Sequence, residues 1–231
     1  MLKPRFFPPP ELADAEGVVA FGGRLSPQWL FDAYTHGIFP WPVIYESEIL
    51  VWFSPDPRAI FELDSFHASR RLRRTIRSGK FQVTSDRAFM AVVRECAASR
   101  SEGGGTWITP AMMAAYQRMH ALGHAHSVEV WRQGRLVGGT YGVAFGGLFA
   151  GESMFYRERD ASKVSLFCLI EHLRARGYQV FDIQQLTEHT RSLGAVEIPR
   201  AEYLKRIKRT VASPVSWGAG LESGLDSDAT A

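Results

Sequence analysis

The chain has 231 residues, with 45% hydrophobic and 22% charged side chains and a formal net charge of +3. This is the composition of an ordinary soluble globular protein, and it excludes disorder, a collagen helix or a coiled coil as descriptions of the whole chain. Two distant cysteines, an amino terminus interrupted by prolines and the lack of an 18-residue apolar run argue against a disulfide framework, a signal peptide or a membrane span, so we expect a cytoplasmic protein.

The first 58 residues are rich in proline and glycine and hold one short helical pattern, which predicts a small loop-rich domain. A second domain is expected over residues 59–212. It begins with a helix over 65–78, a strand over 81–84 and a helix over 86–98. Thr109 and Pro110 then form a cap followed by a first-turn proline, which predicts a helix that closes at Gly123.

Three strand patterns follow, over residues 125–132, 135–145 and 148–156, and they are typical of a meander. A helix over 161–176, a strand over 178–184 and a basic helix over 199–209 complete the pattern. The order indicates an α+β domain with a mixed sheet. Residues 213–231 are rich in Ser, Gly and Asp, and we expect a disordered tail there.

A segment with basic but no acidic residues occupies most of the helix predicted over 65–78 and the residues directly after it. Helical spacing places four of its arginines on one face, away from Leu72 and Ile76. A face without interleaved carboxylates gains no helical ion pairs, which favours phosphate binding over an ordinary solvated surface. The residues concerned are Arg70, Arg71, Arg73, Arg74, Arg77 and Lys80.

Three tryptophans stand beside flexible joints of the chain, at Trp41, Trp52 and Trp107. Aromatic rings near a cationic face can stack nucleic-acid bases. Packing in the core or between domains is the equally weighted alternative.

Polar residues interrupt two apolar strand patterns. Period-two alternation places Asp182 and Gln184 on one face of their strand, and Glu152 interrupts another. Buried carboxylates need a cation or several donors, so the pattern indicates a site for a basic ligand; a structural ion pair with an arginine is the alternative. His124 and His126 alternate on one face but have no third ligand at a recognisable spacing, so no metal is expected.

Several short segments together resemble the leucyl/phenylalanyl-tRNA-protein transferase family of bacteria. They occur in the family's order from Phe21 to Arg200. The segments are FGG at 21–23, LS at 25–26, GIFPW at 37–41, WFSPDPR at 52–58, GTWIT at 105–109, HAHSVEVW at 124–131, GESMF at 151–155, ASK at 161–163, SLGA at 192–195 and EIPR at 197–200.

The resemblance implies a small amino-terminal domain packed on a domain of acetyltransferase-like (GNAT-like) fold. It also implies transfer of Leu, Phe or, less readily, Met from aminoacyl-tRNA to the α-amino group of proteins that begin with Arg or Lys, which creates a degradation signal. By resemblance, Asp182 and Gln184 are catalytic, Glu152 belongs to the active site, and Trp52 and Trp107 contact the terminal adenosine.

An aminoacyl ester is already activated, so this reaction needs no cofactor. Taking a proton from an ammonium group costs an ordinary aspartate about 5 kcal/mol, so we expect Asp182 to orient the amine and Gln184 to hold the amine or the ester. Glu152 is the candidate for gripping the acceptor's cationic side chain. We expect an apolar pocket for the transferred side chain, lined by Phe149, Met154, Leu166 and Leu169, although each one taken singly is more typical of plain core.

Two other functions remain open. A CoA-dependent N-acetyltransferase would suit the domain pattern, but it needs a glycine-rich pyrophosphate loop, and residues 156–163 contain no glycine. A non-catalytic RNA-binding module would explain the arginines and tryptophans, but not the polar residues in the apolar strands.

Overall fold

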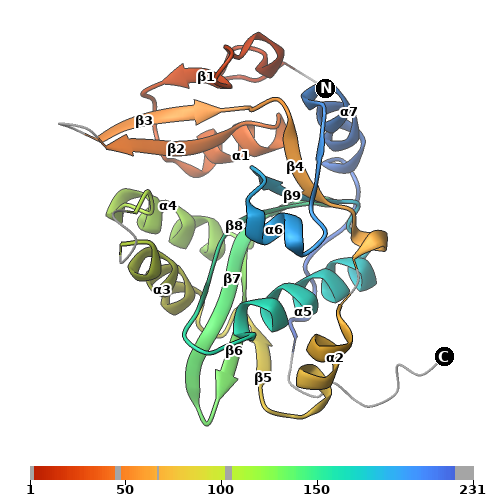
Figure 1. Cartoon of the computed structure of the whole chain (residues 1–231). Helices are drawn as coiled ribbons and strands as arrows, with labels where there is room; N and C mark the ends of the chain where they lie inside the picture. Colours follow the sequence, from red (N-terminus) through yellow and green to blue (C-terminus); the bar gives the residue numbers. More distant parts are fainter. Residues whose placement is uncertain (1–2, 45–47, 67, 102–105, 222–231) are drawn as a thin grey trace.

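The computed structural model describes residues 3–44, 48–66, 68–101 and 106–221 of the chain. Its strands form a three-stranded and a seven-stranded sheet (Figure 1). The strands are β1 (Val18–Phe21), β2 (Phe39–Ile44), β3 (Glu48–Phe53), β4 (Arg58–Phe61), β5 (Gln82–Ser85), β6 (Ala125–Arg132), β7 (Arg135–Phe145), β8 (Leu148–Tyr156), β9 (Val180–Gln184) and β10 (Val196–Ile198).

Helices cover both faces of the larger sheet. They are α1 (Pro27–Thr35), α2 (Arg70–Arg77), α3 (Phe89–Ser101), α4 (Pro110–Ala121), α5 (Ala161–Arg176), α6 (Glu188–Ser192) and α7 (Arg200–Thr210), with short 3-10 turns η1 (Pro10–Leu12) and η2 (Leu63–Ser65). Thr109 caps α4 by accepting a hydrogen bond from the Met112 N–H group, as the sequence predicts.

The small sheet has the order β1-β3-β2 and is antiparallel. The large sheet has the order β10-β4-β9-β8-β7-β6-β5, in which β8 and β9 are parallel and the other neighbours antiparallel. The prediction of an α+β fold with a mixed sheet is confirmed. The meander β6–β7–β8 and helix α5 have the predicted bounds.

The core lies in layers on either side of the large sheet. Helix α5 packs against β6, β7 and β8 on one face, and α3 and α4 pack on the other (Figure 1). On the α3–α4 side, one cluster also includes Leu30, Tyr34 and Trp52 from the amino-terminal part, so the two sheets share a continuous core. Burial of apolar surface therefore joins the two parts.

The parallel pairing of β8 and β9 is short. It runs from Leu148–Val180 to Ala150–Asp182, while β8 continues to Tyr156. The two strands consequently part after Ala150 and Asp182. The side chains that follow, Glu152 and Gln184, lie where the two strands part.

Two sequence predictions need correction. The helix expected over 65–78 is divided into η2 and α2, with Ser69 capping α2 through the Leu72 N–H group. The expected tail disorder is wrong for residues 213–221, because Trp217 is buried and Leu221 exchanges hydrogen bonds with Ser85. Residues 222–231 lie outside the described chain.

None of the helices in the described ranges combines the length and the apolar character needed to cross a lipid bilayer.

Candidate active site

Asp182 lies on β9 and is completely buried. The Arg58 guanidinium donates to both carboxylate oxygens, from Nε to Oδ1 at 2.9 Å and from Nη2 to Oδ2 at 2.6 Å. The Tyr203 hydroxyl donates to Oδ2 at 2.8 Å, and the Gln184 backbone N–H donates to Oδ1 at 2.9 Å. Four donors thus occupy the acceptor positions of Asp182 and leave none for an incoming amine, which contradicts the expectation that this carboxylate orients the amine directly. The structural ion pair with an arginine, the alternative from the sequence, is present.

Gln184 ends β9 in an unusual backbone conformation. Its φ of +60° lies in the left-handed region, which costs a non-glycine residue about 1 kcal/mol or more. The pairing with β4 shifts register here, since Ile60 pairs with Asp182 and Ala59 with Gln184. The bulge and the bond to Asp182 direct the Gln184 side chain toward Glu152, where Nε2 donates to Oε1 at 3.3 Å.

Glu152 also sits at a β-bulge. Gly142 pairs with Gly151 and Tyr141 with Ser153, so Glu152 is the extra residue of β8. Tyr34 of α1 donates to its Oε1 at 2.8 Å, and Tyr116 of α4 donates to its Oε2 at 2.6 Å. The bulge therefore places this carboxylate between two tyrosines from different parts of the chain.

Burial raises the pKa of Glu152 to about 7, although the hydrogen bonds from Tyr116 and Tyr34 oppose the shift. Burial likewise raises the pKa of both tyrosines, and the Glu152 carboxylate raises them further. The tyrosines therefore remain neutral donors at neutral pH. For Arg58, burial lowers the pKa, but the Asp182 carboxylate more than offsets this, so the guanidinium stays charged.

The three polar residues expected to act together therefore lie together. A chain of hydrogen bonds runs from Asp182 through Gln184 to Glu152. The sequence analysis missed the residues that support them: Arg58, Tyr203, Tyr34 and Tyr116. The only local signal was the general need of a buried carboxylate for a cation or donors, which does not say which of many arginines or tyrosines supplies them.

The structure contradicts the predicted stacking role of Trp52. This side chain is completely buried, its Nε1 donates to the Gly22 carbonyl at 2.8 Å, and its ring packs against Phe7 and Trp29. A ring without exposed surface offers no face to a base.

Trp107 instead stacks on Trp41 of β2, with ring centroids 4.9 Å apart and planes 24° apart. Trp107 is 8% exposed, while Trp41 is only partly buried. Trp41 is therefore a better candidate than Trp52 to act with Trp107 in stacking a base, because the two rings are in contact and the Trp41 ring has accessible surface.

The four predicted pocket residues share the α5 side of the sheet. Phe149, Leu166 and Leu169 are buried in the core cluster on that side. Met154 pairs with Thr140, which accepts a hydrogen bond from Ser165 of α5, so Met154 faces α5 as well, and it is only partly buried. Their role as a pocket stays a prediction, and a ligand there would require packed side chains to move.

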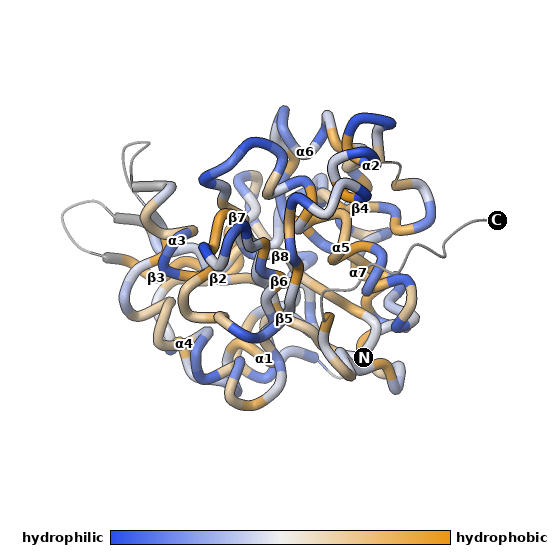
Figure 2. The backbone as a smooth tube through the Cα atoms, turned by 90° about the horizontal axis from the view of Figure 1, so that it is seen from below, coloured by the Kyte–Doolittle hydropathy of each residue, from blue (hydrophilic) through white to orange (hydrophobic). Residues whose placement is uncertain are grey.

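The basic face of α2 is exposed. Leu72 is the buried side chain of the helix, and Arg70, Arg74 and Arg77 have no carboxylate partner within the described ranges. Arg71 pairs with Asp160 at 2.9 Å, and Lys80 pairs with Glu158 at 3.4 Å. Arg73 donates to the Ala68 carbonyl. Figure 2 shows hydrophilic chain around α2 at the periphery of the molecule.

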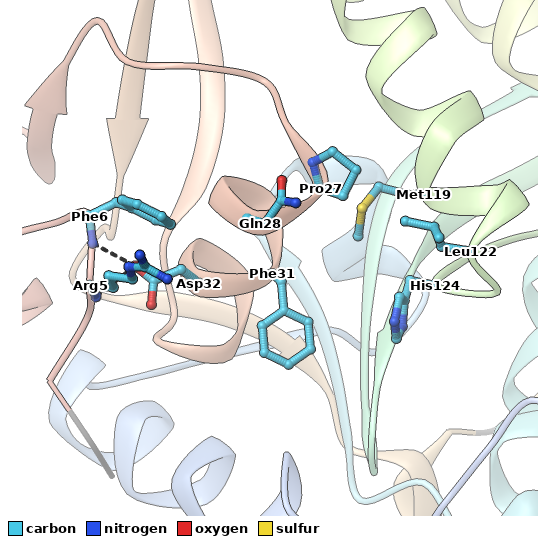
Figure 3. A pocket seen from close by; sticks show the side chains of 9 residues that line it. All are labelled: Arg5, Phe6, Pro27, Gln28, Phe31, Asp32, Met119, Leu122 and His124. Atoms are coloured by element: carbon cyan, nitrogen blue, oxygen red, sulfur yellow. Dashed lines mark hydrogen bonds between the residues drawn. The ribbon is translucent and has the colours of Figure 1, made fainter.

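A cavity of about 420 Å³ lies elsewhere, between α1, the end of α4 and the amino-terminal segment (Figure 3). Phe31 projects into it, opposite Met119, Leu122 and His124. None of the predicted site residues lines it.

The two histidines considered as metal ligands have other contacts. His126 pairs with Asp86 at 2.8 Å and stacks on Trp217, and the His124 ring stacks on Phe145. The described ranges contain no group of three or more His, Cys, Asp or Glu side chains that could hold a metal ion.

Comparison with known proteins identifies the family. The family model "Leucyl/phenylalanyl-tRNA protein transferase" matches residues 60–208, and the model of its N-terminal domain matches residues 23–56. A leucyl/phenylalanyl-tRNA–protein transferase of Azoarcus sp. (strain BH72) is 51% identical over 225 residues, 95% of either chain. The chain belongs to this family. It is an aminoacyltransferase.

A second family member, from Syntrophotalea carbinolica, is 48% identical over 209 residues, 90% of either chain. Among solved structures, a GCN5-related N-acetyltransferase from Kribbella flavida is similar with a TM-score of 0.39 and 10% identity, over 75% of this chain and 61% of that one. This structural similarity is too weak to assign a family, and the assignment to the leucyl/phenylalanyl-tRNA–protein transferase family rests on the sequence matches.

Proposed function

We propose that this family member transfers Leu, Phe and, less readily, Met from aminoacyl-tRNA in the cytoplasm to proteins that begin with Arg or Lys, and thereby creates a degradation signal. The observation that supports this most is the connected set of Asp182, Gln184 and Glu152 at the point where β8 and β9 part. The set offers one neutral amide and one acidic group to a cationic amine substrate.

In this proposal, Gln184 is the residue of the set that contacts the reacting groups. Its amide both donates and accepts, so it can hold the attacking amine or the ester carbonyl in line. Asp182, with every acceptor position occupied, acts through the Gln184 N–H group rather than on the amine directly. Attack forms the peptide bond and breaks the ester bond to the ribose oxygen. The nitrogen loses one proton and the ribose oxygen gains one, either directly or with a water molecule relaying it.

The Glu152 carboxylate binds the cationic side chain of the acceptor protein's first residue. Tyr34 and Gln184 both donate to Oε1, whereas Tyr116 alone donates to Oε2, so Oε2 has an acceptor position left. A cation bound there stabilises the ionised form of Glu152. Preference for Arg or Lys follows from this charge.

The tRNA end would stack on the paired rings of Trp41 and Trp107, and α2 would contact phosphates without reading their sequence. The side chains of Phe149, Met154, Leu166 and Leu169 would surround the transferred apolar side chain. An apolar pocket separates ligands by about 1–3 kcal/mol per methylene, which suits acceptance of several apolar amino acids.

The residues at the start of α5 argue against the alternative function of a CoA-dependent N-acetyltransferase. Asp160 occupies the N-cap of that helix, and Glu158 lies just before it. Carboxylates at a helix N-terminus take the place that the pyrophosphate of CoA would need.

The test is transfer of radiolabelled Leu from charged tRNA to proteins that differ only in their first residue. We expect transfer to an Arg-initiated acceptor, little to the Ala-initiated one, and a large loss of turnover for Asp182→Ala and Gln184→Ala. Equal rates for the two acceptors would exclude the cation-binding role, and undiminished turnover of both variants would exclude the catalytic assignment.

A further inference from the structure

Arg58 connects three parts of the molecule. Its Nε and Nη2 atoms hold Asp182 of β9, its Nη1 donates to the Gly37 carbonyl at 3.0 Å, and its guanidinium lies 4.5 Å from the ring centroid of Tyr203 on α7. Arg58 is 1% exposed, and the sequence separation to Asp182 is 124 residues. A buried, bidentate pair of this kind fixes the orientation of the guanidinium relative to the carboxylate.

Tyr203 completes the arrangement around Asp182. It is fully buried, and its hydroxyl donates to Asp182 Oδ2 while its ring covers the Arg58 guanidinium. Together with the two hydrogen bonds from Arg58, the Tyr203 bond prevents rotation of the Asp182 carboxylate. Its Oδ1 is then fixed where it receives the Gln184 N–H group.

The strained backbone of Gln184 depends on that bond. A left-handed non-glycine residue persists when its surroundings over-determine it, and such strain is concentrated at functional sites. Here the hydrogen bond from the Gln184 N–H group to Asp182 Oδ1 stabilises the strained conformation. That conformation in turn directs the Gln184 amide toward Glu152.

The same arginine also holds the strand that carries Trp41. Gly37 lies two residues before β2, and its φ of +80° and close approach to Leu204 require glycine, since a Cβ would lie 2.6 Å from Leu204 Cδ2. Phe39 of β2 lies under the Arg58 guanidinium at 4.9 Å and contacts the Trp41 ring. Arg58 thus links the proposed adenosine-stacking pair to the reacting amide.

We propose that Arg58 and Tyr203 are positioning residues, which hold Asp182 so that Gln184 is fixed for transfer, with Arg58 also aligning the Trp41 strand. This rests on the function proposed above. Neither residue touches the substrate; both act through their neighbours.

Tyr203→Phe removes one hydroxyl and retains the ring. Loss of its bond to a charged group should lower kcat about tenfold, with KM values for charged tRNA and acceptor unchanged. Arg58→Lys keeps the charge but loses the paired donors of the planar guanidinium. It should therefore lower kcat at least as much as Tyr203→Phe and also raise KM for charged tRNA.

The matched controls are Tyr178→Phe and Arg206→Lys. The Tyr178 hydroxyl is buried without a hydrogen-bond partner in the described ranges, and Arg206 pairs with Glu62 and Glu202 near the surface. Both controls should retain native kcat, and thermal unfolding of all variants reports whether each is folded at the assay temperature.

The deciding measurement is the double variant Tyr203→Phe with Gln184→Ala. If Tyr203 acts through Gln184, it should cause no further loss of kcat in that background. The same tenfold loss in both backgrounds, or native kcat for folded Tyr203→Phe while Gln184→Ala is impaired, would overturn the positioning role alone. Native kcat for Gln184→Ala would overturn the catalytic assignment together with this proposal.

Discussion

At the scale of single residues, Glu152 has the chemistry that depends most on pH. The groups that face it are Tyr34, Tyr116 and Gln184, with Asp182 raising and Arg58 lowering its pKa from farther away. Because its folded-state pKa of about 7 exceeds its ordinary value of 4.5, the folded protein binds a proton that the unfolded chain has already lost between these values. Ionised Glu152 therefore costs stability increasingly as pH rises from 4.5 to 7.

Glu152→Gln removes this cost. Relative to the native protein, the variant's free energy of unfolding should gain about 3 kcal/mol between pH 4.5 and pH 8, measured by urea denaturation. The control Glu158→Gln should change little over this range, because Arg132 and Lys80 lower the pKa of Glu158 below its ordinary 4.5 and its contribution to stability therefore varies mainly below that pH. A Glu152→Gln difference that does not vary with pH would show that this carboxyl is already ionised at pH 4.5.

The tryptophans provide a second prediction at this scale. Trp41→Ala should remove a stacking surface worth about 1–3 kcal/mol and weaken binding of charged tRNA accordingly, with little change in stability. Trp52→Ala should instead lower the free energy of unfolding by about 3–5 kcal/mol, because it empties a fully buried site. Titration calorimetry and denaturation distinguish the two, and unchanged tRNA binding by Trp41→Ala would contradict the revised assignment.

At the scale of elements, the basic face of α2 is the clearest electrostatic feature. Reversing Arg70, Arg74 and Arg77 to Glu removes three exposed cations that have no carboxylate partner in the described ranges. If each contacts a phosphate, the slope of log K against log salt concentration for tRNA binding should become shallower by about 2–3.

The matched control reverses Arg24, Arg94 and Arg135, which are also exposed but belong to other surfaces. The net charge change is the same, so a general field effect would alter both triple variants equally. A larger change for the α2 variant would support local phosphate contacts, and equal changes would make α2 an ordinary surface.

At the scale of the whole molecule, the segment after α7 closes the core beside α5. Trp217 stacks on His126 and Phe149 at 4.4 and 5.6 Å, and its carbonyl accepts from His172. Trp217→Ala should cost about 3–5 kcal/mol of stability, measured by denaturation, although the residue lies in a segment whose composition predicts disorder. A loss below about 1 kcal/mol would indicate that this segment contributes little to the fold.

The sequence alone determined the features that depend on neighbours in the chain. Period-two alternation predicts β6, β7 and β8, the Thr109–Pro110 pair predicts the start of α4, and polar interruptions of apolar strands single out Asp182 and Glu152. Only the tertiary structure decided which residues complete the site. Tyr34 and Glu152 are 118 residues apart, and Arg58 and Asp182 are 124 apart.

Such pairs arise from the packing of whole elements, and no local periodicity encodes them. The same reason explains the reassignment from Trp52 to Trp41 and the burial of Trp217, because the residue type and its neighbours in the chain do not distinguish buried from accessible tryptophans. Local patterns determine which side of an element is apolar; the contacts between elements determine which ring remains accessible and which arginine meets which carboxylate.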